Sequence, residues 1–165
     1  MATPAERKER IARIAALPDA LAAFVAGLND AQLDALGDDD PWTVRQVTHH
    51  VADSHMNAFI RMKLMLTEQH PTLRPYDQDA WALLPDTRTM PVDATLALLR
   101  GLHARWVRLL ESLGDDDWSR GAYHPENGEV TLDGMLATYA QHGEDHVAQI
   151  KRILARVSAS GDASA

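Results

Sequence analysis

The sequence predicts an all-α protein built as a four-helix bundle, on three observations. Alanine, leucine and arginine are abundant whereas aromatic and β-branched residues are few, and this balance favours helix over strand. Four segments carry apolar residues at helical spacing, and glycine, proline or polar turns separate them. The length of 165 residues suits one domain with a single sizeable core.

Each predicted helix has its own start or stop signal. Gly37 stops the first helix, Thr43 can cap the second, Pro91 suits the first turn of the third, and Thr131 can cap the fourth. The predicted helices cover residues 18–36, 43–66, 91–113 and 131–157, with a shorter lead-in helix over residues 4–17.

The connection between the second and third helices, residues 67–90, is unusually long for a compact domain. A four-helix bundle with one long crossover has a central pair of helices that runs parallel, and this connection favours that topology. Within it, RPYDQDAWALL is interpreted as a short helical turn that packs back onto the bundle through Trp81 and Leu84. We expect one domain over residues 1–157 and a disordered tail at residues 158–165.

Charge and composition exclude several classes of protein. The chain has no cysteine, so it offers neither a disulfide framework nor a thiolate ligand for a metal. Its formal net charge of −8, with no local basic patch, argues against nucleic-acid binding. The amino terminus lacks the apolar core of a secretory signal, and no apolar run is long enough to span a membrane. These features predict a soluble cytoplasmic protein.

Two histidines stand four positions apart in QHGEDHVAQI, on the apolar side of the fourth predicted helix. By helical period, His146 lies within the apolar face and His142 at its edge, so the two imidazoles are stacked on one side and can share a metal ion. Gly143 between them is expected to leave room for a ligand. Glu144 points away, which excludes the HExxH metalloprotease pattern. From the spacing alone, metal binding and burial of two histidines that are hydrogen-bonded to neighbouring groups are equally favoured.

A third ligand is available on the second helix, which contains His49, His50 and His55. Its apolar stripe places His55 nearest the centre, His50 to one side, and His49 on the far face. His49 is interpreted as a solvated residue, His55 as a packing residue, and His50 as a residue at the boundary between two helices. Because an ion held between helices can take a ligand from such a boundary, the geometry leaves His50 and His55 both open.

Taken together, PWTVRQVTHHVADSHMNAF, YHPENGEVTL and HGEDH resemble the YfiT branch of the DinB-like superfamily, in the same order and spacing over residues 41–154. Members of this branch include metal-dependent hydrolases and bacillithiol S-transferases. The resemblance implies an up-down-down-up four-helix bundle and one divalent ion, zinc or nickel, held by His50, His142 and His146. The family pattern thus selects His50 over the His55 that periodicity prefers.

The chemistry that the resemblance implies is either hydrolysis of a small molecule or transfer of a low-molecular-weight thiol, of the bacillithiol type, to an electrophilic small molecule. A non-enzymatic, metal-dependent binding or stress-response bundle is the alternative. A homodimer is expected by analogy with relatives. Asp53 and Asp145, each three residues after a predicted ligand, are within reach of supporting the imidazoles, although both also suit a solvated helix surface.

The crossover supplies candidate substrate contacts. Arg74, Tyr76 and Trp81 resemble the RPY-and-Trp segment of the family, which implies a roof over the site and contact with an anionic substrate. Anchoring of the long connection is the competing interpretation for all three residues. No residue is identified as a catalytic general base.

Overall fold

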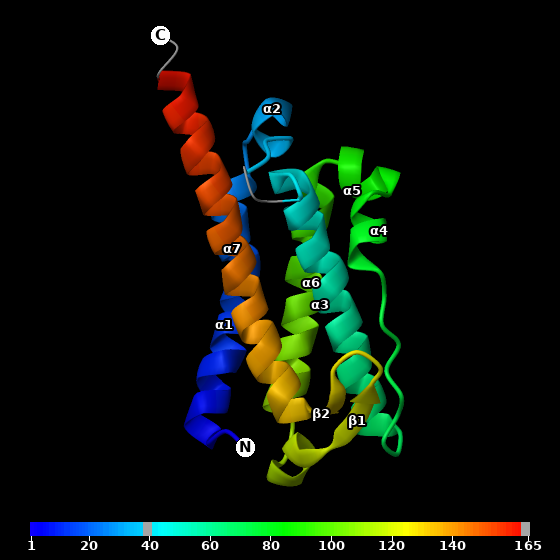
Figure 1. Cartoon of the computed structure of the whole chain (residues 1–165). Coiled ribbons are helices and arrows are strands. Elements are labelled where there is room, and N and C mark those ends of the chain that lie inside the picture. The colour runs from blue at the N-terminus through cyan, green and yellow to red at the C-terminus, as the bar shows by residue number, and fades with distance from the viewer. Residues whose placement is uncertain (38–40, 163–165) are drawn as a thin grey trace.

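Four long helices form the body of the protein in the computed structural model, which describes residues 1–37 and 41–162, with side chains described up to residue 157. Together they make one elongated bundle (Figure 1). They are α1 (Pro4–Val25), α3 (Val44–Thr67), α6 (Val92–Glu111) and α7 (Leu132–Asp162). None of the helices within the described residues is both long enough and apolar enough to cross a bilayer.

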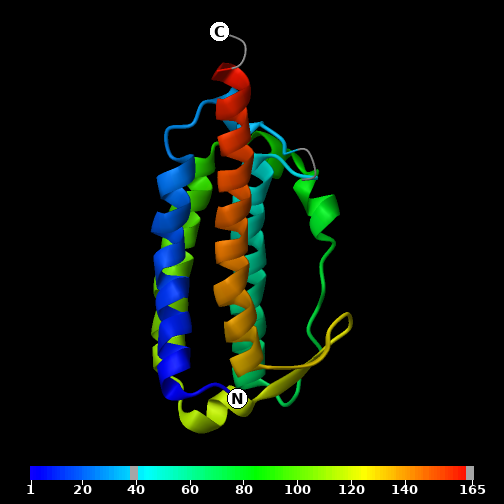
Figure 2. The same cartoon turned by 60° about the vertical axis from the view of Figure 1, so that its left-hand side comes forward.

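The bundle has the predicted up-down-down-up topology. Helices α1 and α7 run in one direction, and α3 and α6 run in the other (Figures 1 and 2). Each helix packs mainly on two others, because α1 contacts α6 and α7, and α3 also contacts both α6 and α7, with a smaller contact between α1 and α3. Since α3 and α6 are parallel, the chain must return along the length of the bundle between them, and this return is the long crossover.

The first helix differs from the prediction at both ends. The structure has one helix, α1, that passes through Pro18, where the sequence predicted a break between a lead-in and a main helix. Ile14, Leu17 and Leu21 are buried on both sides of the proline, so packing of a continuous apolar face outweighs the local cost of that residue. The helix ends at Val25 rather than Leu36.

The segment after α1 turns at once and forms only a single helical turn. Gly27 has a φ of 81°, a left-handed conformation that a glycine adopts without strain. Helix α2 (Asp30–Leu33) then begins with Asn29, whose side chain accepts a hydrogen bond from the backbone of Gln32. A helix that ran through these residues to Leu36 would have to accommodate both a glycine and a strong capping residue.

The crossover climbs the side of the bundle and carries α4 (Gln78–Ala82) and α5 (Pro85–Thr89) near its upper end (Figure 2). The predicted helical turn is present as α4, which Asp77 caps by accepting a hydrogen bond from the backbone N–H of Ala80. The prediction that Leu84 anchors the crossover is wrong, because this residue is 48% exposed. Leu73 and Ala82 are apolar residues of the crossover that are buried and hold it in place, and Pro71 and Thr87 are buried as well.

A β-hairpin precedes the last helix, where the sequence indicated only a turn. A short 3-10 helix, η1 (Asp115–Ser119), leads into strands β1 (Gly121–His124) and β2 (Gly128–Thr131), which pair antiparallel with Gly121 opposite Thr131. The crossover adds to the hairpin, since the backbone N–H of Leu73 donates to the Tyr123 carbonyl at 2.8 Å. The hairpin therefore ties the lower end of the crossover to the base of α7.

Helix α7 continues to Asp162, beyond the helix end predicted at Val157. The predicted disordered tail began at residue 158, so its first part is helical in the structure. Residues 163–165 of that tail lie outside the described residues.

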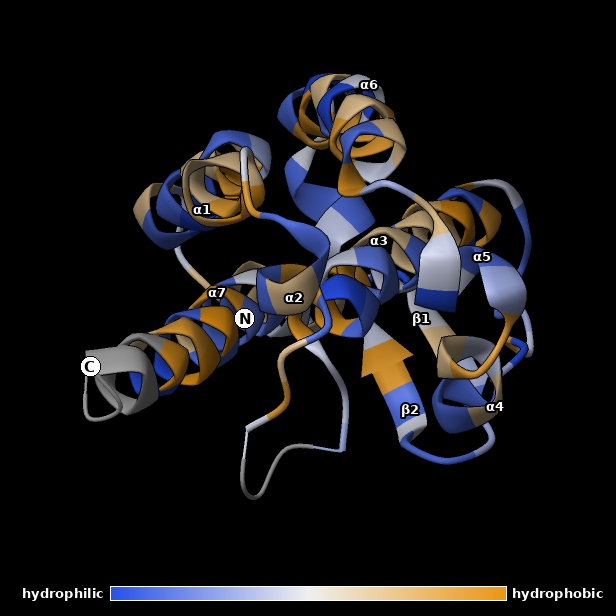
Figure 3. Cartoon of the chain, turned by 90° about the horizontal axis from the view of Figure 1, so that it is seen from above, coloured by the Kyte–Doolittle hydropathy of each residue, from blue (hydrophilic) through white to orange (hydrophobic). Residues whose placement is uncertain are grey.

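The core is divided into two apolar clusters along the bundle axis. Viewed from above, the long helices carry hydrophobic and hydrophilic residues on different sides (Figure 3). The upper cluster includes Val47, Leu99 and Ile150, and the lower includes Met62, Trp106 and Leu136. Five histidines contact one another inside the bundle, three of them buried and two half-buried, and we call them the histidine layer: His50, His55, His103, His142 and His146.

Candidate metal centre

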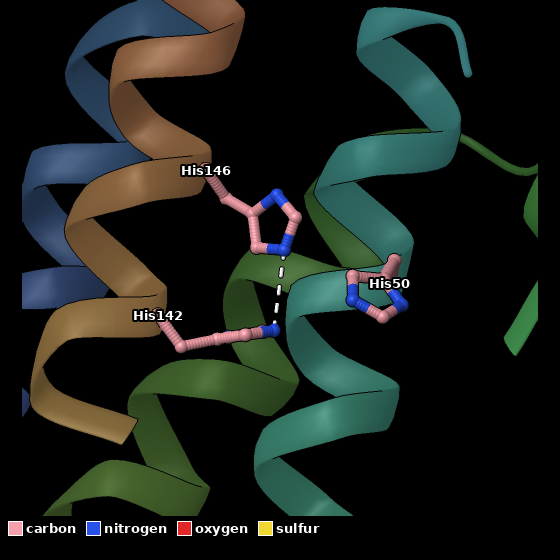
Figure 4. Close-up of side chains that lie close together, drawn as sticks. All are labelled: His50, His142 and His146. Atoms are coloured by element: carbon pink, nitrogen blue, oxygen red, sulfur yellow. Dashed lines mark hydrogen bonds between the residues drawn. The ribbon is translucent and has the colours of Figure 1, made fainter. Parts of the chain in front are cut away.

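Three histidines from two antiparallel helices face one another within the histidine layer (Figure 4). His50 comes from α3, and His142 and His146 come from α7. One ring nitrogen of each lies within 4.8 Å of the corresponding atoms of the other two. The structure thus brings together the three residues that the family resemblance implied, with His50 rather than His55 in the third position.

The proton of His146 is placed by its outer hydrogen bond. Its Nδ1 lies 2.7 Å from the side-chain oxygen Oε1 of Gln149, and an amide oxygen can only accept. His146 therefore carries its proton on Nδ1, which leaves the lone pair of Nε2 directed into the site. Gln149, one turn along the same helix, was not singled out from the sequence.

His142 is oriented by a series of buried histidines, which we call the histidine relay. The relay begins at the carbonyl of Ile14, which lies 2.6 Å from Nδ1 of His103 and must accept a proton from it. Nε2 of His103 is then an acceptor for Nδ1 of His55, at 3.1 Å, and Nε2 of His55 is an acceptor for Nδ1 of His142, at 3.4 Å. Because each neutral ring has only one N–H, the relay leaves Nε2 of His142 unprotonated.

The outcome is two unprotonated ring nitrogens that lie close together. Nε2 of His142 and Nε2 of His146 are 3.2 Å apart, as the dashed line in Figure 4 marks. Two imidazole ligands of a tetrahedral zinc ion, each about 2.0 to 2.1 Å from the metal, have their nitrogens about 3.3 Å apart. The observed spacing of these two unprotonated nitrogens therefore fits a shared cation, and the all-imidazole donor set suits zinc, nickel or copper.

Burial keeps the site histidines neutral at pH 7. Burial lowers the pKa of His50 to about 4, with a smaller contribution from neighbouring His146. Burial also lowers the pKa of His142 to about 3, helped by the charges of His146 and His50. The pKa of His55 is lowered well below its usual value, again mainly by burial. Neutral imidazoles are the form that binds metals, so these rings need no deprotonation before binding.

The ring of His50 is held from outside by an aromatic side chain. Trp42, just before α3, packs on it with ring centroids 4.6 Å apart. Thr43 starts the helix at this point through a capping box with Gln46, as its sequence position predicted. The helix start therefore positions both the ligand candidate and the indole that supports it.

The acceptors of the site histidines differ from the predicted acids. Asp145 accepts a hydrogen bond from Gln141 Nε2 at 2.8 Å, and it only influences His146 through its charge. Asp53 is half-buried, and burial, followed by the charge of Asp86, raises the pKa of its carboxyl to about 6. Among the described residues, neither carboxylate is hydrogen-bonded to an imidazole of the site.

Two further expectations from the α3 and α7 patterns are wrong. His49, expected to be solvated, is buried and bonds through Nδ1 to Thr95 Oγ1 at 2.6 Å, because α6 covers the face of α3 that periodicity assigned to solvent. Gly143, expected to leave room for a ligand, instead makes room for α1: a Cβ there would collide with the side chain of Leu17. Glu144 points away from the site as predicted and pairs with Arg13.

A cleft of about 600 Å³ opens beside the histidines. It is lined by Ser54 and His142 at the bundle, by residues of the hairpin and by residues of the crossover. Tyr76 lines it, and Trp81 packs on Tyr76 with ring centroids 4.5 Å apart. The side chain of Arg74 is exposed and does not line the cleft, so the cation predicted for an anionic substrate is not supplied by that residue.

The cleft also contains residues that the sequence did not single out as substrate contacts. They come from α3, the end of β1 and α7, and are Arg61, His124, Asn127, Thr138 and Tyr139. Arg61 could have been found from the helical period, since it lies seven residues after Ser54 and so on the same side of α3. The hairpin residues could not, because the hairpin itself was not predicted.

Comparison with known proteins matches this site and fold to one family. The family model described as the DinB superfamily matches residues 13–150. The chain is 46% identical over 142 residues to "Putative metal-dependent hydrolase YfiT" of Bacillus subtilis (strain 168), which covers 86% of this chain and 80% of that protein. It is also 46% identical over 148 residues to a protein of the same description from Bacillus cereus (strain 03BB102), covering 90% of this chain and 85% of that protein.

Solved structures agree with the sequence matches. The structure of YfiT from Bacillus subtilis, described as an unusual four-helix bundle topology, aligns with a TM-score of 0.92 at 42% identity, covering 96% of this chain and 91% of that chain. A mycothiol-dependent maleylpyruvate isomerase aligns with a TM-score of 0.68 at 17% identity, covering 91% of this chain and 63% of the other, and at that identity it shares the fold alone. The family model and these relatives together show that the chain belongs to the DinB superfamily.

Proposed function

We propose that this protein is a metal-dependent enzyme that acts on a small molecule, with one divalent ion, zinc or nickel, held by His50, His142 and His146. The observation that carries the proposal is the pair of unprotonated Nε2 atoms 3.2 Å apart, with His50 completing the set beside a cleft. The relatives named as metal-dependent hydrolases support it. A homodimer in the cytoplasm remains the expectation that the family resemblance provides.

Three imidazole ligands leave a coordination position of zinc open, where the ion lowers the pKa of a bound water to about 7 or deprotonates a bound thiol. The chain's own residues orient what enters the cleft. Burial raises the pKa of Tyr76 to about 12, so its phenol keeps its proton at neutral pH and can donate a hydrogen bond to a substrate oxygen. Ser54, whose Oγ is 3.4 Å from Nε2 of His142, stands at the inner end of the cleft.

Two reactions use such a site, and we infer hydrolysis of an ester, amide or related bond as the first candidate because the relatives are named hydrolases. Transfer of a low-molecular-weight thiol to an electrophilic small molecule is the second. The chain has no cysteine, so in that reaction the thiol must be a cosubstrate.

The experiment that tests the proposed function measures metal content and turnover on the same samples. Untagged protein is analysed by plasma mass spectrometry, then assayed with and without metal on chromogenic esters and on a thiol plus an aryl halide. We expect about one zinc or nickel per chain and a reaction that stops when the metal is removed and returns when it is restored. Equal rates for both samples, or no metal after incubation with zinc and nickel, would favour a non-enzymatic binding bundle.

The histidine relay makes a separate prediction. His103→Leu removes the acceptor of the His55 N–H, so His142 loses its fixed tautomer, and we expect zinc affinity to fall by about tenfold, the lower end of what the loss of an outer hydrogen-bond partner costs. His103→Gln, which offers one donor and one acceptor, should keep most of the affinity. Affinity is measured by competition with a chromophoric chelator, and ¹⁵N shifts of the metal-free protein report which nitrogen of His142 is protonated.

The matched control for the relay is His49→Leu. His49 is a histidine of α3 that is also buried but bonds to Thr95 and the Met90 carbonyl, outside the relay. This variant should lose stability without a change in zinc affinity or in the His142 tautomer. If His103→Leu also leaves both quantities unchanged, the relay does not orient the ligand.

A further inference from the structure

One residue that lines the cleft is a buried cation for which the described residues provide no anionic partner. Arg61 on α3 is only 8% exposed, and within the described residues no carboxylate pairs with it. Its Nη2 donates to the backbone carbonyl of Arg74 at 2.6 Å, and its guanidinium lies 5.9 Å from the ring of Tyr76. Its Nε is buried with no hydrogen-bond partner among the described residues.

Such a group is unusual, because buried charges in proteins are normally paired and buried polar atoms are normally hydrogen-bonded. The other buried arginines of this chain follow that rule. Arg7 pairs with Asp133 at 3.0 Å, and Arg45 pairs with Asp34 at 2.7 Å. Arg61 differs from both in having no carboxylate partner among the described residues, and it lines the cleft.

The position of Arg61 sets the shape of that molecule. Arg61 is seven residues after Ser54 and eleven after His50, so all three lie on one side of α3, about 10 and 16 Å apart along the helix axis at 1.5 Å per residue. Arg61 and His142 line the same cleft. A ligand that reaches both the candidate metal centre and Arg61 must therefore be elongated, with a metal-directed group at one end and a negative charge at the other.

The charges around Arg61 limit how much negative charge a bound anion can carry. Asp77 and Glu126 also line the cleft, and both are exposed at its rim. They would repel a dianion such as a phosphate monoester more strongly than a monoanion. A guanidinium matches a carboxylate by two parallel hydrogen bonds, so a single carboxylate satisfies Arg61 at the lowest electrostatic cost.

We propose that Arg61 forms an anion subsite that selects elongated small molecules carrying a carboxylate at the end opposite to the reacting group. This inference rests on the proposed function, because it takes the three histidines as the place where the other end of the substrate binds. In this proposal Arg61, rather than the predicted Arg74, binds the anionic end of the substrate. Arg74 only accepts a hydrogen bond from Arg61 through its backbone carbonyl.

The first test uses two thiols of equal length on protein loaded with cobalt, whose thiolate complexes absorb in the near ultraviolet. The probes are mercaptooctanoic acid and mercaptooctanol, which differ only at the end that would reach Arg61. We expect the acid to bind roughly ten- to a hundredfold more tightly, as hydrogen bonds to a charged group allow.

Three variants test whether Arg61 causes this preference. Arg61→Met should abolish the preference and Arg61→Lys should keep part of it. Arg74→Met, which removes an exposed cation outside the cleft, should leave it unchanged. Equal affinities of the two probes for the unaltered protein, or a preference that survives Arg61→Met, would overturn the proposal.

A second measurement separates this inference from the metal proposal and needs no variant. Metal-free protein is titrated with octanoate or octanol, and the Nε–H signal of Arg61 is followed by nuclear magnetic resonance. A shift with octanoate alone supports the subsite even if cobalt fails to bind, in which case only the proposed function is lost. If neither probe shifts the signal while cobalt binds normally, the proposed anion subsite is refuted and the proposed metal centre is still supported.

Discussion

Replacing His142 with alanine is expected to lower zinc affinity by more than the roughly 10- to 100-fold that the loss of an outer hydrogen-bond partner costs. The substitution removes one of the two nitrogens that are already at ligand spacing, 3.2 Å apart. His146→Ala should have the same effect, and His50→Ala should follow closely. Metal content after dialysis and competition with a chromophoric chelator measure the loss.

His124→Ala is the matched control for these variants, because His124 is buried like His50 and lines the cleft like His142 but is not part of the three-histidine cluster. Its metal content should not change. His55→Ala should cost less than any ligand variant, since His55 acts only through the N–H of His142. If His55→Ala instead removes the metal and His50→Ala does not, the third ligand is His55 and the assignment from the family pattern is wrong.

Acid should destabilise the metal-free protein strongly between pH 6.5 and about 4. The pKa of His50 is about 4 in the folded protein and about 6.5 in the unfolded chain, so below pH 6.5 the unfolded state binds a proton that the folded state does not. Stability is therefore fully present above pH 6.5 and is lost as the pH falls toward the folded value. At 1.36 kcal/mol per pKa unit, His50 alone accounts for about 3 kcal/mol.

Other groups modify this acid sensitivity. Burial lowers the pKa of His142 to about 3 and also lowers the pKa values of His49, His55 and His103, so their contributions have the same sign. Asp53 opposes them: its folded pKa of about 6 lies above the unfolded value, so the folded state gains stability as that carboxyl is protonated. Since one half-buried acid opposes several buried histidines, we expect a net loss.

Urea denaturation at several pH values between 8 and 4 measures this loss as a falling midpoint. His50→Gln should flatten the curve, because it removes a group that titrates only in the unfolded state. His70→Gln is its control, since the His70 side chain is exposed and 2.7 Å from Glu129 on the surface. A midpoint that stays constant from pH 7 to 4.5 would show that the histidine layer admits protons without unfolding.

The helices and the α7 histidine pair could be predicted from the sequence, because each prediction uses only the 3.6-residue spacing of apolar residues within a single helix. The choice between His50 and His55 could not, because α3 contacts α1, α6 and α7, and a helix buried on most sides has no single inward stripe. The family resemblance supplied that residue instead. The same burial explains why His49 was assigned to solvent.

The support of the site escaped prediction for a different reason. The relay joins His142 to His55, His103 and the carbonyl of Ile14 across four helices, and only the assembled bundle places them in contact. Asp145 was a reasonable acceptor for a site imidazole by sequence distance, yet its carboxylate accepts a hydrogen bond from Gln141 instead. Arg61 was overlooked because an arginine on a helix is normally at the surface, although its helical period relative to Ser54 indicated the inner side of α3, and its 8% exposure in the structure confirms that position.

The histidine layer also fixes how the four helices are aligned along their length. A bundle with an uninterrupted apolar interior can shift one helix by a turn and still bury similar side chains. Here such a slip would leave the N–H of His103 without the carbonyl of Ile14 and break every later hydrogen bond of the series. At about 1 to 3 kcal/mol for each buried polar group left unsatisfied, the competing alignments are disfavoured before any metal arrives. The sequence therefore encodes the axial registry of the bundle in the same residues that prepare the site.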